Sequence, residues 1–512
     1  SQISRLDITG GGMPTLVVHD PASGQRASFD LTASPLRSGD ASIQAVTDSQ
    51  ALMFEDRARG LNTATLARLA EAAPSGDSAK VYLDGLGFSG NLVALHHVQM
   101  GSRGYLYAAS ATGSGVSAYH IAEDGELALI ADLTSGPYLD GIAALDSIML
   151  NGTRFLVTAS MPGNGVGVLE ITDDGAMRTV GSFGTDEHLP VHQPSALTLV
   201  EQDGRVFVLL ASYGSASLTV LELGDDGSLR FVDQVSDTLH SRFGQVAALD
   251  TITVDGQVLV AVAGSDGGVS LFQMLPDGWL VHRETLIDQL DTALTGVRQL
   301  RFATVEGQVE LFALSAGDAG MTRLALDLGS LGVTGEGDLG TDGNDVLTAA
   351  AGSSRLQAGA GDDILVDGGG ADTLWGGSEA DLFVFRPDNQ SDTIADFDAV
   401  EDRIDLSAFA LLYDPRDIAI TEITGGASLQ WGREELLVMT GDGSALELDQ
   451  ITDQLLFNSD HVWMPVALPT VGDAGNDSFI WSTGADTLDG GDGYDSITYA
   501  AAPERVIVDL GN

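Results

Sequence analysis

The sequence predicts an all-β protein in which a β-propeller is followed by parallel β-roll blocks, with a β-sandwich-like cap between the blocks. Two internal repeats support this prediction: one of about fifty residues, and one of nine residues with a recurrent aspartate. A third observation is the charge, because 74 acidic residues oppose 23 basic ones and leave a net charge of −51. We expect the divisions to fall at residues 1–333, 334–384, 385–466 and 467–512.

The longer repeat marks each of its units with an Asp-Gly pair. These pairs begin at Asp124, Asp174, Asp226 and Asp277, spaced by 50, 52 and 51 residues. Each pair follows an alternating strand such as Leu218–Leu223 and precedes another strand, which is a strong hairpin signal. Repeats of about 40–50 residues with four short strands are typical of propeller blades. The longer repeat therefore predicts a ring of blades.

The number of blades follows from five clear units and two weaker ones, around Met13–Leu31 and Gln50–Ala72. They predict seven blades, and an N-terminal strand could complete the short unit that starts at Gln308. Two alternatives stay open: a six-bladed ring, or an N-terminal α/β decoration, because Ala64–Ala72 could be helical. The segment His192–Leu229 resembles lactonase-like, YVTN-type seven-bladed propellers, which implies the fold and says little about function.

The shorter repeat fills Gly340–Val384 with five nine-residue units and no gap. Position six is Asp345, Ser354, Asp363, Asp372 and Asp381, and position eight is Leu347, Leu356, Leu365, Leu374 and Phe383. Gly-rich turns with one recurrent Asp and one apolar residue indicate a calcium-binding parallel β-roll. A flexible acidic linker would have no reason to keep the apolar residue in phase.

The ligand chemistry of these turns suits calcium. Carboxylate oxygens and inward backbone carbonyls are what Ca²⁺ needs for its six to eight ligands at about 2.3–2.6 Å. Zinc would require His or Cys, and neither occurs in the repeats. Successive turns alternate between the two sides of a roll, so each turn shares an ion with the next turn but one. One side is intact through Asp345, Asp363 and Asp381 and predicts two ions, whereas the other side is broken at Ser354.

A second block, Gly472–Thr498, repeats the same frame. Asp477 and Asp495 predict one ion there, and Asp486 lacks a clear partner. We expect this roll to continue beyond Asn512. In the first block, the following segment could complete the site of Asp372 with Asp388, Asp392 or Asp396. The predicted metal-binding residues are Gly340, Asp342, Asp345, Gly359, Asp362, Asp363, Asp372, Gly376, Asp381, Asp392, Asp396, Gly472, Asp473, Asp477, Asp486, Gly490, Asp492 and Asp495.

These nonapeptides resemble the RTX, or hemolysin-type, repeats of secreted calcium-binding proteins. The segment FRPDNQSDTIADFDAVEDRIDLSAFA after Val384 also resembles the region that follows the roll in that family. The resemblance implies a β-rich cap with strands such as Ser428–Trp431 and Glu435–Thr440. It also implies type I secretion to the exterior or outer surface of a Gram-negative bacterium, which fits the absence of cysteine.

Catalytic motifs are missing from the propeller sequence. It contains no Gly-x-Ser-x-Gly elbow, no His-Glu-x-x-His and no phosphate loop. The candidate catalytic residues are His188, His192, His240 and Arg242, in predicted loops between blades. The sequence therefore favours a structural or adhesive role, as an adhesin, matrix component or surface-layer subunit. The alternative is a secreted lactonase-like hydrolase that acts at the propeller mouth.

The net charge of −51 also bears on partners. Self-repulsion of that size disfavours a compact state without counter-ions, and it disfavours nucleic acid or anionic membranes as partners. We expect calcium as the cofactor, and other proteins or copies of this chain as partners. No apolar stretch reaches the length of about 18 residues that a membrane-spanning helix needs.

Overall fold

The computed structural model describes residues 5–9, 15–20, 25–30, 42–45, 92–110, 114–122, 127–289, 292–305, 307–316, 321–326, 328–409, 412–457, 461–462, 478–480 and 496–498. The chain divides into two compact units, Ser1–Val462 and Trp463–Asn512. Within the described residues the fold is all-β apart from the helix α3 (Leu448–Thr452) and the 3-10 turns η2 (Thr185–Glu187) and η3 (Pro415–Asp417). No helix in this part of the chain is long and apolar enough to cross a membrane.

Six antiparallel sheets form the propeller in the described part of the first unit. Five of them have four strands each: β1 (Arg5–Thr9), β2 (Thr15–Asp20), β3 (Gln25–Asp30) and β4 (Ser42–Ala45); β5 (Leu92–Met100), β6 (Arg103–Ser110), β7 (Val116–Ile121) and β8 (Leu127–Leu133); β9 (Ile142–Leu150), β10 (Thr153–Ser160), β11 (Gly165–Ile171) and β12 (Met177–Gly184); β13 (Pro194–Gln202), β14 (Arg205–Ser212), β15 (Ser217–Leu223) and β16 (Leu229–Ser236); and β17 (Ala248–Val254), β18 (Gln257–Ala263), β19 (Gly268–Met274) and β20 (Leu280–Ile287). The sixth has β21 (Val297–Val305), β22 (Gln308–Ser315) and β23 (Met321–Ala325).

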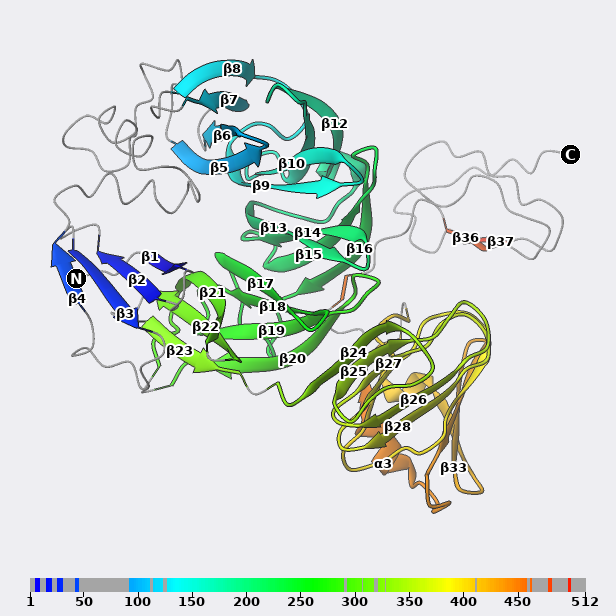
Figure 1. Ribbon diagram of the computed structural model, residues 1–512. Helices are drawn as coiled ribbons and strands as arrows, with labels where there is room; N and C mark the ends of the chain where they lie inside the picture. Colours follow the sequence, from blue (N-terminus) through cyan, green and yellow to red (C-terminus); the bar gives the residue numbers. More distant parts are fainter. Residues whose placement is uncertain are drawn as a thin grey trace, which may run out of the picture. The chain divides into compact units, whose positions relative to one another are not determined.

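The blades follow one another in chain order (Figure 1). Their first strands β5, β9, β13, β17 and β21 contact one another in succession, and β1 contacts β21. Second strands such as β14, β18 and β22 are buried along almost their whole length because each blade packs between two others. This explains why these strands are continuous apolar runs and do not alternate.

The sheets confirm the propeller and correct one detail. The first four clear sequence repeats each supply the second to fourth strands of a sheet, and the fifth supplies β22 and β23. The Asp-Gly pairs at Asp174, Asp226 and Asp277 join third to fourth strands. An N-terminal strand could have completed the short unit, but the described N-terminal strands β1 to β4 pair with one another in a sheet of their own. The weak repeat around Gln50–Ala72, on which the seven-blade count depends, lies outside the described residues, as does Asp124.

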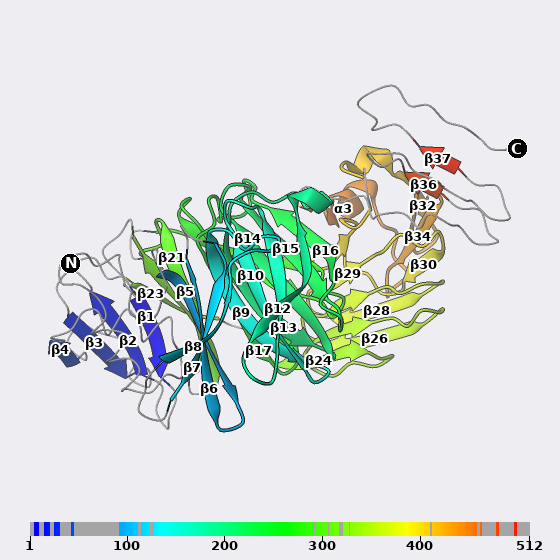
Figure 2. The ribbon, with the colours of Figure 1, turned by 90° about the horizontal axis from the view of Figure 1, so that it is seen from above.

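The first roll consists of two six-stranded sheets. In order across the sheets, one contains β24 (Leu331–Glu336), β25 (Asn344–Thr348), β27 (Ile364–Val366), β29 (Leu382–Val384), β31 (Arg403–Asp405) and β35 (Leu455–Leu456), and the other contains β26 (Arg355–Ala360), β28 (Thr373–Ser378), β30 (Ser391–Ile394), β34 (Glu434–Met439), β33 (Gly426–Trp431) and β32 (Ala419–Ile423). Consecutive nonapeptides alternate between the sheets, so each strand pairs in parallel with the strand of the next nonapeptide but one, for example Leu347 with Leu365. Figure 2 shows β26, β28 and β30 side by side.

Position eight of every nonapeptide points between the two sheets. All five of these residues are at most 1% exposed and belong to one hydrophobic core. Strands alternate their faces, so the neighbouring residues Val346, Ile364 and Val384 point away from that core. They are nevertheless buried, which shows that the outer face of this sheet is covered as well.

The region after the repeats extends both sheets of the roll. Strands β30, β31, β34 and β35 add to the sheets in parallel, and β32 and β33 add antiparallel strands at one edge. Phe397, Leu436 and Ile451 join the core of the nonapeptide residues. The region is β-rich and two-layered, and it continues the roll without a separate core.

The expected strands in this region are present as β33 and β34. The roll also begins earlier than residue 334, since β24 pairs with β25. In the second unit, β36 (Ser478–Ile480) pairs in parallel with β37 (Ser496–Thr498), which belongs to the next nonapeptide but one. The division of the chain into four domains stays a prediction.

Candidate calcium sites

Close stacking of the turns explains why the roll needs glycine. Gly359 and Gly377 have φ values of 121° and 112°, which residues with a side chain rarely adopt. A Cβ atom on Gly377 would lie 1.9 Å from the carbonyl oxygen of Gly359, one layer away. A Cβ atom on Gly359 would lie 2.3 Å from the carbonyl oxygen of Thr341. Backbone carbonyls of successive layers therefore crowd together at the turns.

The sixth-position aspartates on one side form a ladder, which we call the first ladder. The backbone N–H of Asp345 donates to Oδ1 of Asp363 at 2.7 Å, and that of Asp363 donates to Oδ1 of Asp381 at 3.0 Å. The N–H of Asp381 in turn donates to Oδ1 of Asp402 at 3.0 Å. All four side chains are at most 3% exposed. Four carboxylates are thus stacked in a buried column.

The second ladder, on the other side, is shorter. The N–H of Ser354 donates to Oδ1 of Asp372 at 2.6 Å, and that of Asp372 donates to Oδ1 of Asp392 at 2.9 Å. The hydroxyl of Ser354 donates to the carbonyl of Gly352 in its own turn. As the sequence predicted, this side lacks a carboxylate at its first layer and is continued by Asp392.

The electrostatics of the ladders favour the binding of a cation. Burial raises the pKa of Asp363 to about 7 and that of Asp381 to about 8, with further increases from neighbouring carboxylates. Burial likewise raises the pKa values of Asp392 and Asp402 to about 6. Carboxyl groups in this state are costly to ionise, and a bound divalent cation would remove that cost.

Unpartnered oxygen atoms support the same conclusion. Within the described residues, the Oδ2 atoms of Asp363 and Asp381 are buried and have no hydrogen-bond partner. Both carboxylate oxygens of Asp367, which is 3% exposed, are also buried without a partner. Buried oxygens without donors are rare in proteins and are the ligands that a hard cation prefers. The donor set of the roll therefore fits calcium.

These sites need more than side chains. In the described residues, no group of three or more His, Cys, Asp or Glu side chains gathers in a geometry that could hold a metal. An ion at a ladder would take further oxygens from the crowded carbonyls of the turns. This is compatible with calcium, which accepts backbone carbonyls among its ligands.

The remaining predicted ligands differ in their surroundings. Asp396 accepts a hydrogen bond from the N–H of Gly376 at 3.0 Å, and burial raises its pKa. Asp342 and Asp362 are exposed at the rims of their turns, although Asp362 accepts from the N–H of Ala380 at 3.1 Å. The predicted ligands of the second block lie outside the described residues.

Sequence reasoning missed Asp402. Asp402 follows Asp381 by more than two nonapeptides, so it is out of phase with the repeat. No Gly-rich turn precedes it. The register of β29 with β31, which places Leu382 opposite Arg403, puts Asp402 on the first ladder. A search that allowed short insertions between layers would have found it.

The four catalytic candidates of the propeller lie in different local surroundings. His192 lines a cavity of about 470 Å³, where its Nδ1 lies 3.1 Å from Oδ1 of Asn164. The guanidinium of Arg242 donates to carbonyls of its own loop, and the carbonyl of His240 accepts from Thr285. His188 ends the 3-10 turn η2 with a left-handed φ of 67°.

Comparison with known protein families agrees with the assignment of the roll. The family model of the RTX calcium-binding nonapeptide repeat matches residues 339–366, 357–385 and 471–497. No curated protein matches the chain. These matches cover both blocks in which the sequence shows the nine-residue frame.

Solved structures resemble the chain only weakly. An exo-β-1,3-galactanase from Phanerochaete chrysosporium has 13% identity and a TM-score of 0.31, over 46% of this chain and 60% of that one. A functionally unknown protein from Desulfotomaculum acetoxidans has 13% identity and a TM-score of 0.33, over 64% of this chain and 90% of that one. A protein from Lactobacillus plantarum has 13% identity and a TM-score of 0.33, over 62% and 83%.

This chain thus spans less than two thirds of the length of the galactanase, and similarity at these scores is no basis for assigning an activity. The assignment of the propeller is based on its own sheet topology, and the assignment of the roll is based on the ladders and the family model. The chain carries RTX calcium-binding nonapeptide repeats beside a β-propeller.

Proposed function

We propose that this is a secreted or cell-surface protein whose rolls fold on calcium and whose propeller is an interaction module with a structural or adhesive role. The observation that carries the proposal is the first ladder, a buried column of four aspartates. Without a cation their mutual repulsion opposes the fold. With calcium the same groups become ligands, so metal binding and folding are coupled.

The proposed location outside the cell is supported by the affinity that extracellular calcium modules generally have. Extracellular calcium modules bind their ions at about 10⁻⁴–10⁻³ M, a concentration found outside cells and not in the cytosol. A roll with that affinity stays unfolded during export and folds after it. The absence of cysteine agrees with a fold that needs no disulfide in an oxidising space.

The coupling is tested by titrating the full chain with calcium while following far-UV circular dichroism and heat of binding. We expect strand signal to rise between about 10⁻⁴ and 10⁻³ M calcium. Asp363→Asn should weaken this response at least tenfold, because it removes a carboxylate from the middle of the first ladder. Asp173→Asn is the matched control, because it makes the same change of charge at an exposed propeller turn. A chain whose spectrum is the same in calcium and in chelator would overturn the proposal.

The structural or adhesive role has its own test. We expect sedimentation at about 10⁻³ M calcium to show assembly of the chain with itself, or attachment to an outer-membrane surface, that chelator reverses. If the chain folds with calcium but stays monomeric and binds no surface, calcium binding stands and the adhesive role is refuted.

One observation favours the second candidate, a lactonase-like hydrolase. His192 lines a cavity together with Asn164 and Gln193, and these side chains could orient a small polar substrate. Lactone hydrolysis that is lost in His192→Ala and retained in His240→Ala would support this activity. Equal rates in both variants and the unaltered chain would exclude His192 as the catalytic residue.

A further inference from the structure

One blade departs from the propeller repeat where it meets the roll. The residue after the Asp-Gly pair is Ala176 in one blade and Ser228 in the next, but Trp279 in the third. In all three turns its N–H donates to Oδ1 of the turn's aspartate, at 3.2, 2.9 and 3.0 Å. The turn itself therefore does not require tryptophan.

The Trp279 ring instead holds two side chains that come from beyond the repeats. The His461 ring stacks on it with a centroid distance of 4.3 Å and an interplanar angle of 8°. The Arg386 guanidinium lies 4.6 Å from the ring centroid, and its Nη2 donates to Oδ2 of Asp277 at 3.1 Å. Stacking and cation–π contacts of this kind both favour the packed arrangement of the three side chains.

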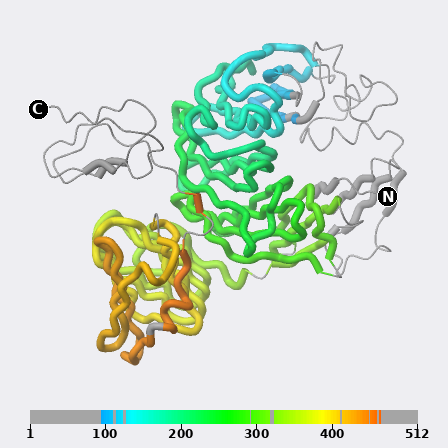
Figure 3. The backbone as a smooth tube through the Cα atoms, turned by 180° about the vertical axis from the view of Figure 1, so that it is seen from behind, coloured from blue at the N-terminus to red at the C-terminus, as the bar shows by residue number. Residues whose placement is uncertain are grey.

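His461 also ties the chain to the neighbouring blade. Its Nδ1 lies 2.8 Å from Oδ1 of Asp233, whose Oδ2 accepts from the N–H of Leu280 at 2.9 Å. The N–H of Val462 donates to the carbonyl of Gln234 at 2.7 Å, so the segment pairs with the free edge of β16 (Figure 3).

The charge of His461 is set by that neighbour. Burial lowers the pKa of His461, but the Asp233 carboxylate outweighs burial and raises it above the ordinary value. Asp405 adds to the increase and Arg386 opposes it. The surroundings therefore favour the protonated ring and an ion pair with Asp233.

An apolar contact surrounds these polar ones. Leu275 and Val281 of the blade pack with outward-facing residues of the roll sheet in one buried cluster. Those roll residues are Val346, Ile364, Val366 and Val384. Leu275 and Val281 therefore cover the outer face of this roll sheet, which would otherwise be exposed to water.

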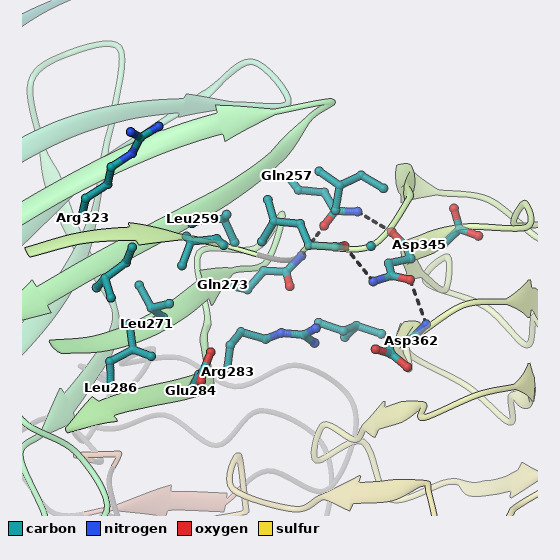
Figure 4. A pocket seen from close by; sticks show the side chains of 18 residues that line it. Gln257, Leu259, Leu271, Gln273, Arg283, Glu284, Leu286, Arg323, Asp345 and Asp362 are labelled. Atoms are coloured by element: carbon teal, nitrogen blue, oxygen red, sulfur yellow. Dashed lines mark hydrogen bonds between the residues drawn. The ribbon is translucent and has the colours of Figure 1, made fainter. Parts of the chain in front are cut away.

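A further contact joins the first roll turn to the same blade. Nε2 of Gln257 donates to the carbonyl of Asn344 at 2.6 Å, and Oδ1 of Asn344 accepts from the N–H of Asp362 at 2.9 Å. Figure 4 shows these bonds beside a cavity of about 700 Å³, into which Arg283 reaches toward Asp362.

The roll residues that pack on the blade are adjacent in sequence to aspartates of the first ladder. Val346 directly follows Asp345, and Ile364 directly follows Asp363. A cation that orders these layers therefore also places the valine and isoleucine side chains that meet the blade. Without it, repulsion among the ladder carboxylates works against the same two strands.

We propose that Asp233, Asp277, Trp279, Arg386 and His461 form a calcium-controlled latch, through which the ordered roll stabilises the propeller. The proposal rests on the proposed function, since calcium must first order the roll. Coupling of this kind is reciprocal: a closed latch also raises the calcium affinity of the roll. The edge of β16 and the turn between β19 and β20 are the propeller parts that should respond.

The test compares the full chain with Trp279→Ser by hydrogen–deuterium exchange, with and without calcium. The variant should fold, because Ser228 occupies the same place in the preceding blade. In the unaltered chain, calcium should slow exchange in β16 and in β19–β20. In Trp279→Ser this protection should disappear, and the calcium midpoint for ordering of the roll should rise about fivefold or more. Ser228→Ala, in a turn away from the latch, should behave like the unaltered chain.

The outcomes separate the two proposals. If calcium orders the roll in both chains and β16 is protected equally in both, the latch is refuted and calcium-driven folding stands. If calcium leaves the roll unprotected even in the unaltered chain, calcium-driven folding itself fails. Exchange in the buried strand β14 confirms that each variant keeps its propeller.

Discussion

At the scale of single residues, buried aspartates determine how the folding of the roll depends on pH and on calcium. Asp363 and Asp381 differ from exposed carboxylates because they are buried in a column of like charges. Their neutral forms suit the metal-free fold, and their ionised forms suit calcium. Protons and calcium therefore compete for the same oxygens.

The pH dependence of the metal-free roll follows from these two groups. Their pKa values in the fold, about 7 and 8, lie above the ordinary value of 3.8, so folding takes up protons. The stability they contribute is complete below the ordinary value and is lost as the pH rises through 7 and 8. We expect chelator-treated roll to gain strand structure on acidification, as followed by circular dichroism. Loss of structure on acidification over that range would contradict the assignment.

The broken layer of the second ladder can be repaired. Ser354→Asp places a carboxylate above Asp372, whose Oδ1 already accepts the N–H of residue 354. We expect calorimetry to find one more calcium ion per chain than in the unaltered protein. Ser353→Asp, at a neighbouring position of the same turn, is the control. Unchanged stoichiometry in Ser354→Asp would mean that the carbonyls of this side do not support a site.

At the scale of elements, stacking leaves no room for a side chain at particular turn positions such as Gly377. Gly377→Ala would place a Cβ atom against the carbonyl of Gly359 and hold alanine at a φ of 112°. We expect a loss of about 2–3 kcal/mol in the unfolding free energy of the calcium-bound roll, measured by denaturant titration. Gly352→Ala is the matched control, because no atom lies within 4 Å of its Cβ position. Equal stability of the two variants would refute the close stacking.

Sequence periodicity predicted the elements that repeat and missed those that do not. Leu347 and Phe383 could be placed in the core because position eight recurs in every nonapeptide. Asp402 could not, since a short insertion shifts it out of phase. The extension of the roll by β31 and β35 was missed because parallel pairing joins segments far apart in sequence and has no local turn signal.

At the largest scale, the proposed latch links the propeller to the roll within the first unit. The apolar face of the roll packs on one blade, and the chain returns to pair with the edge of another. Trp279 was visible in the sequence as a departure from Ala176 and Ser228. Its partners Arg386 and His461 were not, because they come from distant parts of the chain that no repeat links to the blade.

The central claim is that the stacked aspartates of the first ladder hold calcium. Anomalous scattering from crystals grown with calcium tests it most directly. The account predicts peaks between successive layers of Asp345, Asp363, Asp381 and Asp402, within about 2.3–2.6 Å of carboxylate and turn carbonyl oxygens. Ordered ladders without an anomalous peak at calcium concentrations of about 10⁻³ M or more would contradict it.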